Sequence, residues 1–397
     1  MEWALWCMAL GLVAVPALPV LVFAAECLSG SLPRHTQGAP THGSRFPVAV
    51  LVPAHDEERG ITRTLALIRA QMRSGDRLLV VADNCSDRTA ELGRAAGAEV
   101  IERRNADQRG KGYALDYGLQ HLRQAPCPVV VFVDADCELV AGSLDALARS
   151  VAATGRPVQS LNLMVARDRA GTINGGVAEF AFRVKNLVRP RGLARFGLPC
   201  QLMGTGMALP WEVVEEASFA NGHLAEDMKL GLELAGAGHA PLFCETACVL
   251  SAFPESGAGA DGQRSRWENG HLTLMSTCLS ALFTRQMPRS PAAIAMTLDV
   301  LVPPLTLLAF VQLAALIVGL AAAWAGLGLA PLVVAGAATA LLLAGTAAAW
   351  SAEGRDIVPP AALLRIPLYM LAKAWIYPRA LFGQVEQAWV RAERNRA

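Results

Sequence analysis

The chain has 397 residues, which allows two or three domains, and its formal net charge of +1 gives no reason to expect a nucleic-acid partner. Hydrophobic residues make up 53% of it and charged residues only 17%, and the mean hydropathy is +0.35, which is too apolar for a soluble protein of this size. The nine cysteines form no Cys-x-x-Cys pair, so we expect reduced thiols and no zinc site.

The apolar excess lies at the two ends of the chain. Residues 3–25 carry no charge and are long enough to span a bilayer, which predicts an N-terminal transmembrane anchor over 1–28 and a linker over 29–45. Near the other end, residues 294–352 are predicted to form two transmembrane helices with a break near 325–331. We therefore expect an integral membrane protein.

The charged residues that flank the apolar segments predict their orientation. Glu2 precedes the first segment, and Arg34 and Arg45 follow it, which favours an uncleaved anchor whose N-terminus lies outside. Residues 353–397 contain seven lysines and arginines and are predicted to form an interfacial helix and a basic cytoplasmic tail. Residues 46–262 are accordingly expected to be a cytoplasmic domain attached to the inner (plasma) membrane.

From residue 46 onward, strand-like and helix-like segments alternate along the chain. Short apolar runs predict strands over residues 47–52, 78–82, 99–101 and 128–133. Apolar residues at helical spacing predict helices over residues 57–72, 87–96, 110–122 and 143–151. This alternating order predicts an α/β fold with a mainly parallel sheet and helices on both faces. The less regular part that follows is expected to add further elements over residues 158–164, 177–188, 203–210 and 224–237.

The most informative motif is Asp134-Ala135-Asp136, which directly follows the predicted strand over 128–133. Carboxylates at the C-terminal ends of parallel strands stand where such sheets bind their ligands. Two of them can hold Mg²⁺ or Mn²⁺, and such an ion in turn binds a diphosphate. The motif makes the chain a candidate for handling nucleotide diphosphates, although Asp-x-Asp alone also occurs at solvated strand ends.

Three further polar clusters are predicted at the same edge of the sheet. They are Pro53-Ala54-His55-Asp56-Glu57-Glu58, Asp83-Asn84-Cys85-Ser86-Asp87 and Gly110-Lys111-Gly112. Each alone can be explained by helix capping or by first-turn residues that the helix dipole favours. Because the ends of parallel strands share one edge, all four clusters are expected to converge, which favours a common binding site.

The clusters resemble the ordered motifs of a known family. In sequence order they read Val-Pro-Ala-His-Asp-Glu-Glu, Ala-Asp-Asn-Cys-Ser-Asp, Arg-Gly-Lys-Gly-Tyr-Ala-Leu, Asp-Ala-Asp, Ala225-Glu226-Asp227 and Gln263-Arg264-Ser265-Arg266-Trp267. Over residues 48–267 this order is similar to family 2 of the inverting glycosyltransferases, in its membrane-embedded branch of cellulose, chitin and hyaluronan synthases and ceramide glucosyltransferases. The resemblance implies a GT-A-type nucleotide-sugar-binding domain flanked by transmembrane helices.

The resemblance also implies which residues bind the donor. The nucleoside would be framed by Pro53, Ala54 and Glu57, and the uracil edge would donate a hydrogen bond to Asp83. The diphosphate would be neutralised by Lys111. Two residues beside the nucleoside depart from the family pattern, because Asp56 stands where Asn is usual and Asn84 where a second Asp is common.

A second group of residues would act at the transferred sugar. By the resemblance, Asp134 would lie beside the donor sugar and diphosphate, and Asp136 would ligate Mg²⁺ or Mn²⁺. Asp227 would be the general base that takes the proton from the acceptor hydroxyl, with Glu226 as the next candidate. An interfacial helix region is predicted over 263–290. The donor site would be closed at the membrane face by Gln263, Arg266 and Trp267.

The expected function is the transfer of a hexose or N-acetylhexosamine from a UDP-sugar to a lipid-linked or glycan acceptor by an enzyme surrounded by membrane lipids. One alternative is a processive polysaccharide synthase that works as a homo-oligomer. Another is a non-catalytic scaffold that binds nucleotide-sugars, although such a protein would be expected to lack Asp136 or Asp227. A nucleotidyltransferase would require a Gly-rich phosphate loop near the first strand, where this chain has acidic residues instead.

Overall fold

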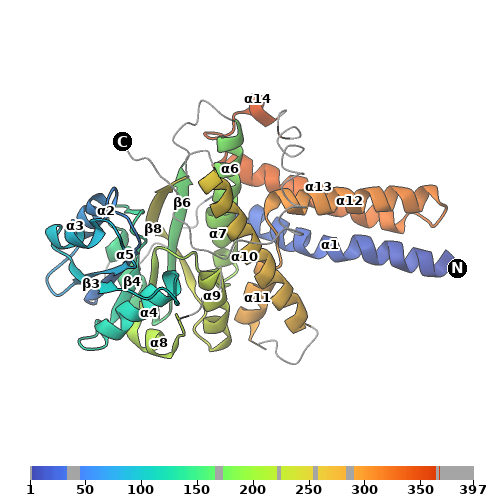
Figure 1. Ribbon diagram of the computed structural model, residues 1–397. Coiled ribbons are helices and arrows are strands. Elements are labelled where there is room, and N and C mark those ends of the chain that lie inside the picture. Colours follow the sequence, from blue (N-terminus) through green and yellow to red (C-terminus); the bar gives the residue numbers. More distant parts are fainter. Residues whose placement is uncertain are drawn as a thin grey trace.

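The computed structural model describes residues 2–33, 45–165, 173–220, 225–253, 258–282, 290–363 and 366. Figure 1 shows an α/β domain from which three long helices extend side by side. The N-terminus lies at the far tip of these helices, away from the sheet (Figure 1). The molecule therefore separates into a water-facing part and an apolar part, as the composition of the sequence predicts.

Eight strands of the described chain form one sheet in the order β3-β2-β1-β4-β7-β6-β8-β5. The strands are β1 Val48–Ala54, β2 Arg77–Asp83, β3 Glu99–Arg103, β4 Val129–Phe132, β5 Glu138–Leu139, β6 Val158–Val165, β7 Met207–Pro210 and β8 Leu242–Ala252. β1 runs parallel to both β2 and β4, and β2 runs parallel to β3. β7 runs antiparallel to β4 and β6. The predicted mainly parallel sheet is confirmed, with one antiparallel strand in its interior.

Helices cover both faces of the sheet. They are α2 Ile61–Arg69, α3 Thr89–Ala95, α4 Lys111–Leu122, α5 Ser143–Thr154, α8 Trp211–Glu216 and α9 Glu226–Gly236. One core contains Val50 and packs β1 against α2 and α5, and a second core contains Leu51 and packs the other face against α4, α8 and α9. Neighbouring residues of β1 thus face opposite cores, which explains why this strand is a continuous apolar run.

Strand β8 was not predicted from the sequence. It runs parallel to β6, and the pairing shifts register between Ser160 and Leu161. Glu245 and Thr246 interrupt the apolar pattern of β8, so neither a continuous run nor a strict alternation marks it. The strand exists because its partner strand and helix α5 cover it, which a local pattern cannot reveal.

Three helices of the described chain are long and apolar enough to cross a membrane. They are α1 Glu2–Gly30, α12 Leu305–Trp324 and α13 Ala330–Glu353. The second span begins later than the predicted start at residue 294, because a separate helix α11, Pro291–Val300, comes first. Pro303 and Pro304 follow α11, and proline both lacks the N–H that a helix needs and disfavours helical geometry in the residue before it.

Two further helices fall in regions where interfacial helices are predicted. Helix α10 spans Ala258–Leu282 and so begins before the predicted boundary at 263, and helix α14 spans Pro360–Leu363. Except for residue 366, the predicted basic tail beyond 363 lies outside the described residues. The positions of α10 and the tail relative to a bilayer stay predictions.

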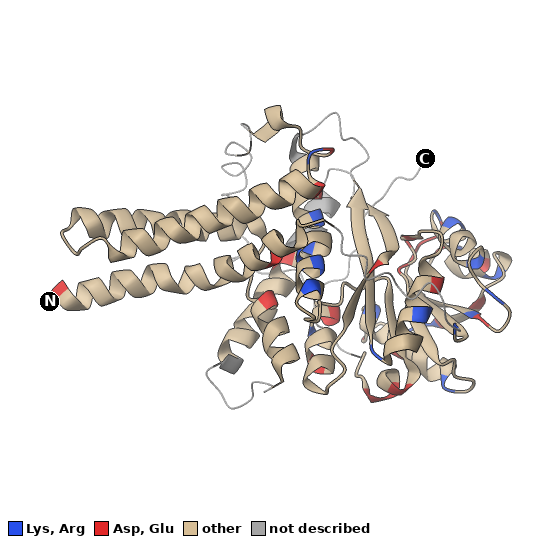
Figure 2. Ribbon diagram, turned by 180° about the vertical axis from the view of Figure 1, so that it is seen from behind, with Lys and Arg blue, Asp and Glu red and all other residues tan. Residues whose placement is uncertain are grey.

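A continuous helical segment joins the α/β domain to the long helices. It consists of α6 Ile173–Arg183, the π-helix η1 Val184–Val188 and α7 Arg189–Arg195. The buried Arg189 lies between Glu26 of α1 and Asp299 of α11, with nitrogen–oxygen distances of 2.6 and 2.5 Å. Arg191 reaches Glu353 at the end of α13 at 2.8 Å. Figure 2 shows basic residues gathered at this junction, which fixes the domain to the long helices by ion pairs.

Helices α1 and α7 cross so closely that two positions require glycine. A Cβ atom on Gly30 would lie 1.9 Å from the carbonyl oxygen of Val188, and one on Gly192 would lie 2.1 Å from the carbonyl oxygen of Glu26. Both atoms would collide with main chain, which cannot move aside as a flexible side chain can. This contact therefore fixes α7 against α1.

Candidate active site

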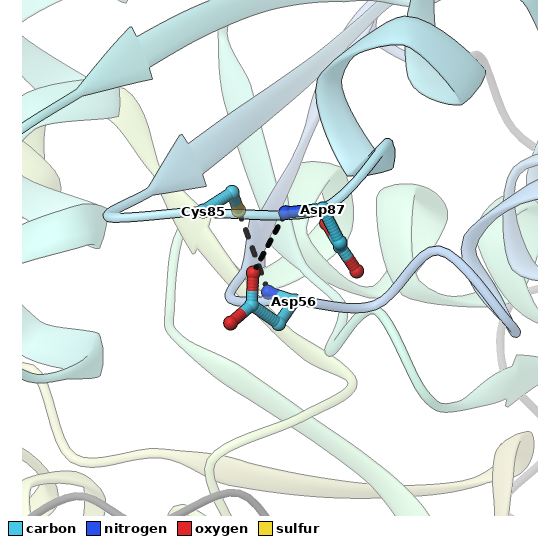
Figure 3. A group of neighbouring side chains, drawn as sticks. All are labelled: Asp56, Cys85 and Asp87. Atoms are coloured by element: carbon cyan, nitrogen blue, oxygen red, sulfur yellow. Dashed lines mark hydrogen bonds between the residues drawn. The ribbon is translucent and has the colours of Figure 1, made fainter.

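The loops after β1 and β2 are held together by carboxylates. Asp56 has a φ of +52°, a left-handed conformation that Asp tolerates better than most residues. Its Oδ1 accepts a hydrogen bond from the main-chain N–H of Asp87 at 3.3 Å, and Sγ of Cys85 accepts one from the N–H of Asp56 at 3.4 Å (Figure 3). Asp87 accepts from the main-chain N–H of Glu58 at 3.0 Å.

The same three side chains, Asp56, Cys85 and Asp87, lie close enough together to hold a metal ion. Oδ1 of Asp56, however, already accepts hydrogen bonds from main-chain N–H groups of the facing loop, and the two oxygens of Asp87 accept from the main-chain N–H groups of Glu58 and Thr89. Their arrangement is explained by loop closure, as in the side-chain turns that Asp commonly makes. These loops thereby set the edge at which the nucleoside is predicted to bind.

The predicted nucleoside residues lie beside one another on β1 and β2. Pro53 and Ala54 pair with Val81 and Ala82 of β2, which brings Asp83 to the same edge. Glu57 follows in the loop, where its main-chain N–H donates to Thr89 Oγ1 at 2.7 Å. These positions agree with the predicted convergence of the first two clusters.

Asp83 is buried with one oxygen paired and one left open. Its Oδ1 accepts a hydrogen bond from Nη1 of Arg103 at 2.7 Å, and Arg103 lies over the ring of Tyr113. The other oxygen, Oδ2, is buried and has no hydrogen-bond partner in the described chain. A buried carboxylate oxygen without a partner is costly, so it is well suited to accept an N–H from a ligand. Arg103 was not predicted as a site residue. Its only signal in the sequence is that it is a basic residue close after the third predicted strand.

Lys111 begins α4 and lies at the centre of the polar edge. Its Nζ forms an ion pair with Asp134 and donates to the carbonyl oxygen of Gly204 at 2.8 Å. Burial alone lowers the pKa of this ammonium, but the carboxylates of Asp134, Glu226 and Asp227 outweigh burial and raise the pKa. Lys111 therefore stays protonated and can neutralise phosphate oxygens.

The predicted metal ligand lies on the loop that follows β4. Ligand atoms of Asp134, Asp136 and Cys137 lie within 4.8 Å of one another. The main-chain N–H of Asp134 donates to Thr205 Oγ1 at 3.1 Å, which fixes the start of this loop. Two carboxylates fit Mg²⁺ or Mn²⁺, which prefer oxygen ligands. The donor set therefore suits a hard divalent cation.

Glu226 and Asp227 form the first turn of α9 and face Lys111. Asp227 Oδ1 accepts from the main-chain N–H of Met228 at 2.8 Å, which stabilises its ionised form. Burial, and then the field of Asp227, raise the pKa of Glu226 to about 7, while Lys111 opposes them. Burial also raises the pKa of Asp227. Asp227 accepts the additional main-chain hydrogen bond from Met228, so it is the better placed of the two acids to carry the negative charge.

A narrow cavity connects these groups. It lies between α4 and α9 and is lined by residues that include Lys111, Gly204, Phe219, Glu226 and Asp227. Gly204 has a φ of +81°, and a Cβ atom there would lie 3.1 Å from Oδ2 of Asp227 and 3.4 Å from Nζ of Lys111. Because Gly204 has no side chain, the space between the Asp227 carboxylate and the Lys111 ammonium stays open. The sequence did not point to Gly204, because its neighbours come from segments far away in the chain.

The three residues predicted at the membrane face lie on helix α10. Trp267 is 43% exposed, so its ring is available for contact. The side chains of Gln263 and Arg266 lie outside the described part of the structure. His271, one helical turn beyond Trp267, is buried, and its Nε2 lies 2.8 Å from the carbonyl oxygen of Val300. This contact joins α10 to α11, which gives His271 a structural role.

Known proteins with similar sequences and folds are glycosyltransferases. A family model described as glycosyltransferase like family 2 matches residues 45–270. An uncharacterized glycosyltransferase of Mycobacterium tuberculosis is 30% identical over 194 residues, which are 42% of this chain and 82% of the relative. The probable glycosyltransferase YdaM of Bacillus subtilis is 26% identical over 260 residues, which are 61% of this chain and 59% of the relative.

A solved structure extends the likeness to the whole fold. The mannosyltransferase PcManGT from Pyrobaculum calidifontis, in complex with GDP-Man and Mn²⁺, is similar over 96% of this chain and 99% of that chain, with a TM-score of 0.57 at 20% identity. The family model covers more than half of the 397 residues, and its range contains every predicted catalytic and donor-binding residue. The chain therefore belongs to glycosyltransferase family 2 and is an enzyme that transfers a sugar from a nucleotide-sugar donor.

Proposed function

We propose that this enzyme is membrane-bound and moves a hexose or N-acetylhexosamine from a UDP-sugar to a lipid-linked or glycan acceptor, with inversion at the anomeric carbon. The observation that carries the proposal is the arrangement around Gly204. There Asp227 on α9, Lys111 on α4 and Asp134 after β4 line or adjoin one cavity. A carboxylate base thus stands next to the groups that hold a diphosphate.

The reaction follows from this arrangement. The acceptor hydroxyl gives its proton to Asp227 while its oxygen forms a bond to the anomeric carbon. The bond between that carbon and the diphosphate breaks, and Lys111 neutralises the charge that develops on the departing oxygen. The new bond forms on the face opposite the leaving group, so a single displacement inverts the configuration. Asp227 needs to act only as a base for this chemistry.

A divalent cation would be held by Asp136, with Asp134 beside it. When bound, the ion supplies a positive charge that stabilises the leaving diphosphate. The Lys111–Asp134 ion pair lies on the same side of the cavity, so donor binding brings two cationic groups to the two phosphates. We propose Mg²⁺ or Mn²⁺, because both prefer the oxygen ligands present here.

The buried Oδ2 of Asp83, which has no partner in the described chain, limits which base the donor nucleotide can carry. It can accept the N3–H of uracil, which supports the UDP-sugar assignment. It could equally accept the N1–H of guanine, and the similar mannosyltransferase holds GDP-Man. GDP-mannose is therefore the competing donor that an assay must include.

The membrane part supports an acceptor that resides in or at the bilayer. The helices α1, α12 and α13 can span a membrane, and α7 fixes the catalytic domain directly against them. The three candidate spans in the described part of the chain are few to enclose a polysaccharide channel, which favours addition to a lipid-linked acceptor. The oligomeric processive synthase is the alternative. We propose that the N-terminus faces outward and that the catalytic domain faces the cytoplasm.

The decisive experiment is a donor screen with product analysis. Membranes that contain the full chain would be incubated with a panel of UDP-sugars and with GDP-mannose, and the glycosylated product would be identified by mass spectrometry. We expect turnover with one UDP-hexose or UDP-N-acetylhexosamine, and an anomeric configuration opposite to the donor by NMR. Turnover with GDP-mannose alone would contradict the UDP assignment, and retention of configuration would contradict the single displacement.

A further inference from the structure

A second lysine near the base has no assigned role. Lys185 lies on η1, the π-helical turn between α6 and α7, and its neighbours Val184, Asn186 and Leu187 are buried while its own side chain is exposed. Lys185 makes no hydrogen bond or ion pair with any other residue in the part of the chain that the structure describes. Single π-helical turns inside helices occur frequently at functional sites, because they change the direction of one side chain.

The turn η1 is tied to the loop that carries Gly204. Asn186, next to Lys185, donates to the carbonyl oxygen of Asn162 at 3.1 Å, and Nδ2 of Asn162 donates to that of Met203 at 3.4 Å. Loss of hydration lowers the pKa of Lys185 although its side chain is accessible, and the Asp227 carboxylate is the main opposing influence. In return, Lys185 and Lys111 both lower the pKa of Asp227. Asp227 therefore has an ammonium group on η1 as well as the one on α4.

The two lysines differ in what already neutralises them. Lys111 is paired with Asp134 and donates to Gly204, in the part of the cavity assigned to the donor diphosphate. Lys185 has no such partner, and it belongs to the helical segment that meets the membrane anchor. Val188, the last residue of η1, contacts Gly30 of α1 so closely that no side chain fits at position 30. Lys185 thus lies between the base and the helices that span the bilayer.

We propose that Lys185 binds the phosphate group of a lipid acceptor and thereby places a nearby hydroxyl of that lipid at Asp227. The ligand class is a lipid that carries a free hydroxyl close to a phosphate, such as a phosphoglycerol headgroup or a sugar attached through phosphate. An ammonium is a strong partner for phosphate oxygens. The assignment rests on the proposed function and specifies its acceptor.

The test compares the binding of matched lipids. Full-length enzyme in a non-ionic detergent without sugar or phosphate would be titrated with dioctanoyl phosphatidylglycerol and with dioctanoylglycerol, which has a hydroxyl but no phosphate. We expect the phosphate-bearing lipid to bind roughly 10- to 100-fold more tightly, as loss of a charge-assisted hydrogen bond predicts. Lys185→Gln should remove this difference, and Lys185→Arg should largely retain it. The affinity for UDP should not change in either variant.

Lys229 provides the matched control. It lies on α9 two residues after Asp227, is partly exposed, and its Nζ stands 3.7 Å from a carboxylate oxygen of Glu233. Lys229→Gln therefore removes one positive charge from the helix of the base without changing η1. This variant should bind both lipids as the wild type does. In a transfer assay, Lys185→Gln should raise KM for the phosphate-bearing acceptor and leave kcat nearly unchanged, whereas a structural defect would also weaken UDP binding.

Three results would overturn the assignment. In the first, Lys185→Gln binds the phosphate-bearing lipid as tightly as the wild type does. In the second, the wild type binds the two lipids equally tightly. In the third, the wild type binds free glycerol 1-phosphate as tightly as the phosphate-bearing lipid, which would indicate a soluble acceptor. The proposed function fails separately. If the wild type shows the expected lipid affinities but transfers no sugar from any nucleotide-sugar, the acceptor site stands and the catalytic assignment is wrong.

Discussion

At the scale of single residues, Glu226 and Asp227 are adjacent acids with different surroundings. Asp227 has a main-chain hydrogen bond and lies against Gly204, so it is the proposed base. Asp227→Asn keeps the shape but cannot take a proton, so kcat should fall by about 10²- to 10⁴-fold while donor affinity stays nearly constant. Single-turnover kinetics and UDP-sugar titration would measure the two effects. Near-normal turnover of Asp227→Asn would instead assign the role of general base to Glu226.

Glu226 makes stability depend on pH. Its pKa is about 7 in the folded chain, against an ordinary value of 4.5, so the folded state holds a proton that the unfolded chain has released. The contribution of Glu226 is therefore most favourable below pH 4.5, and stability is lost as the pH rises through 7. Glu226→Gln cannot ionise, so its melting temperature relative to wild type should be higher at pH 8 than at pH 5. An equal difference in melting temperature between variant and wild type at the two pH values would contradict the raised pKa of Glu226.

Asp136 should control the response to metal. Excess chelator should abolish transfer, and added Mn²⁺ or Mg²⁺ should restore it. Asp136→Asn should lower turnover by several orders of magnitude, because a neutral amide is a poor ligand for a hard cation. Loss of the Mn²⁺-dependent broadening of bound-nucleotide NMR signals in this variant would report metal binding separately from catalysis. Full activity in excess chelator would exclude the metal.

At the scale of elements, the ion pairs of α7 should dominate the stability of the domain junction. Arg189 is buried between Glu26 and Asp299, and Oε1 of Glu26 has no hydrogen-bond partner in the described chain. Arg189→Met would leave two buried carboxylates without a cation, which typically costs about 3–5 kcal/mol. Thermal unfolding of the full chain in detergent would measure this loss. Arg88→Met, which breaks an exposed pair with Glu91, should leave the melting temperature unchanged.

The elements that could be predicted from sequence are those with a local signal. β1 and β4 are continuous apolar runs, and the carboxylates after β4 mark its C-terminal end, so the first half of the sheet and its binding edge were predictable. β8 was not, since Glu245 and Thr246 break its pattern and the strand depends on pairing with β6. Prolines at 303 and 304 were a readable signal for the end of α11, which the prediction of two spans starting at residue 294 overlooked.

The residues of the site likewise fall into those that the sequence indicates and those that only the fold reveals. Lys111 and Asp134 belong to short motifs at the ends of predicted parallel strands, so their convergence could be expected from the order of strands and helices. Asp227 was assigned to the same site only by the family resemblance. Arg103 and Lys185 could not be assigned roles, because their importance depends on partners from other elements. Arg103 acquires its role from its ion pair with Asp83 on the neighbouring strand. The proposed role of Lys185 depends on its charge acting on Asp227 from η1, an element far away in the sequence. A π-turn has no distinct sequence pattern, so only the folded chain reveals this lysine.

At the scale of the whole molecule, the long helices have the surface of membrane spans. Their apolar side chains are widely exposed, among them Val15 at 75% and Ile317 at 58%, which in water would be unfavourable. Trp3 at 77% and Trp324 at 93% lie near the ends of α1 and α12 that are farthest from the sheet (Figure 1). Tryptophan concentrates at membrane–water interfaces, so these two residues indicate where the far interface lies.

This arrangement predicts the topology of the enzyme. The N-terminus and the turn between α12 and α13 lie at the same end of the long helices, opposite the catalytic domain (Figure 1). Nucleotide-sugars are cytoplasmic, so the turn should face outward. Cys7, Cys85 and Cys248 are partly exposed and would first be changed to Ala. In that background, Ala325→Cys should react with an impermeant thiol reagent in intact cells, and Ser74→Cys in the catalytic domain should react only after lysis.

The labelling outcome bears on the reaction as well as on the orientation. Ala325 and Ser74 are both exposed, so a difference between them reports the side of the membrane and not burial. Labelling of Ser74→Cys in intact cells, with protection of Ala325→Cys, would place Lys111 and Asp227 away from the cytoplasmic donor pool. The proposed use of a UDP-sugar would then fail even though the fold and the site remain intact. The proposed function therefore requires this orientation. Because the junction at α7 fixes the catalytic domain against one end of the long helices, the orientation of those helices decides on which side of the membrane the domain lies.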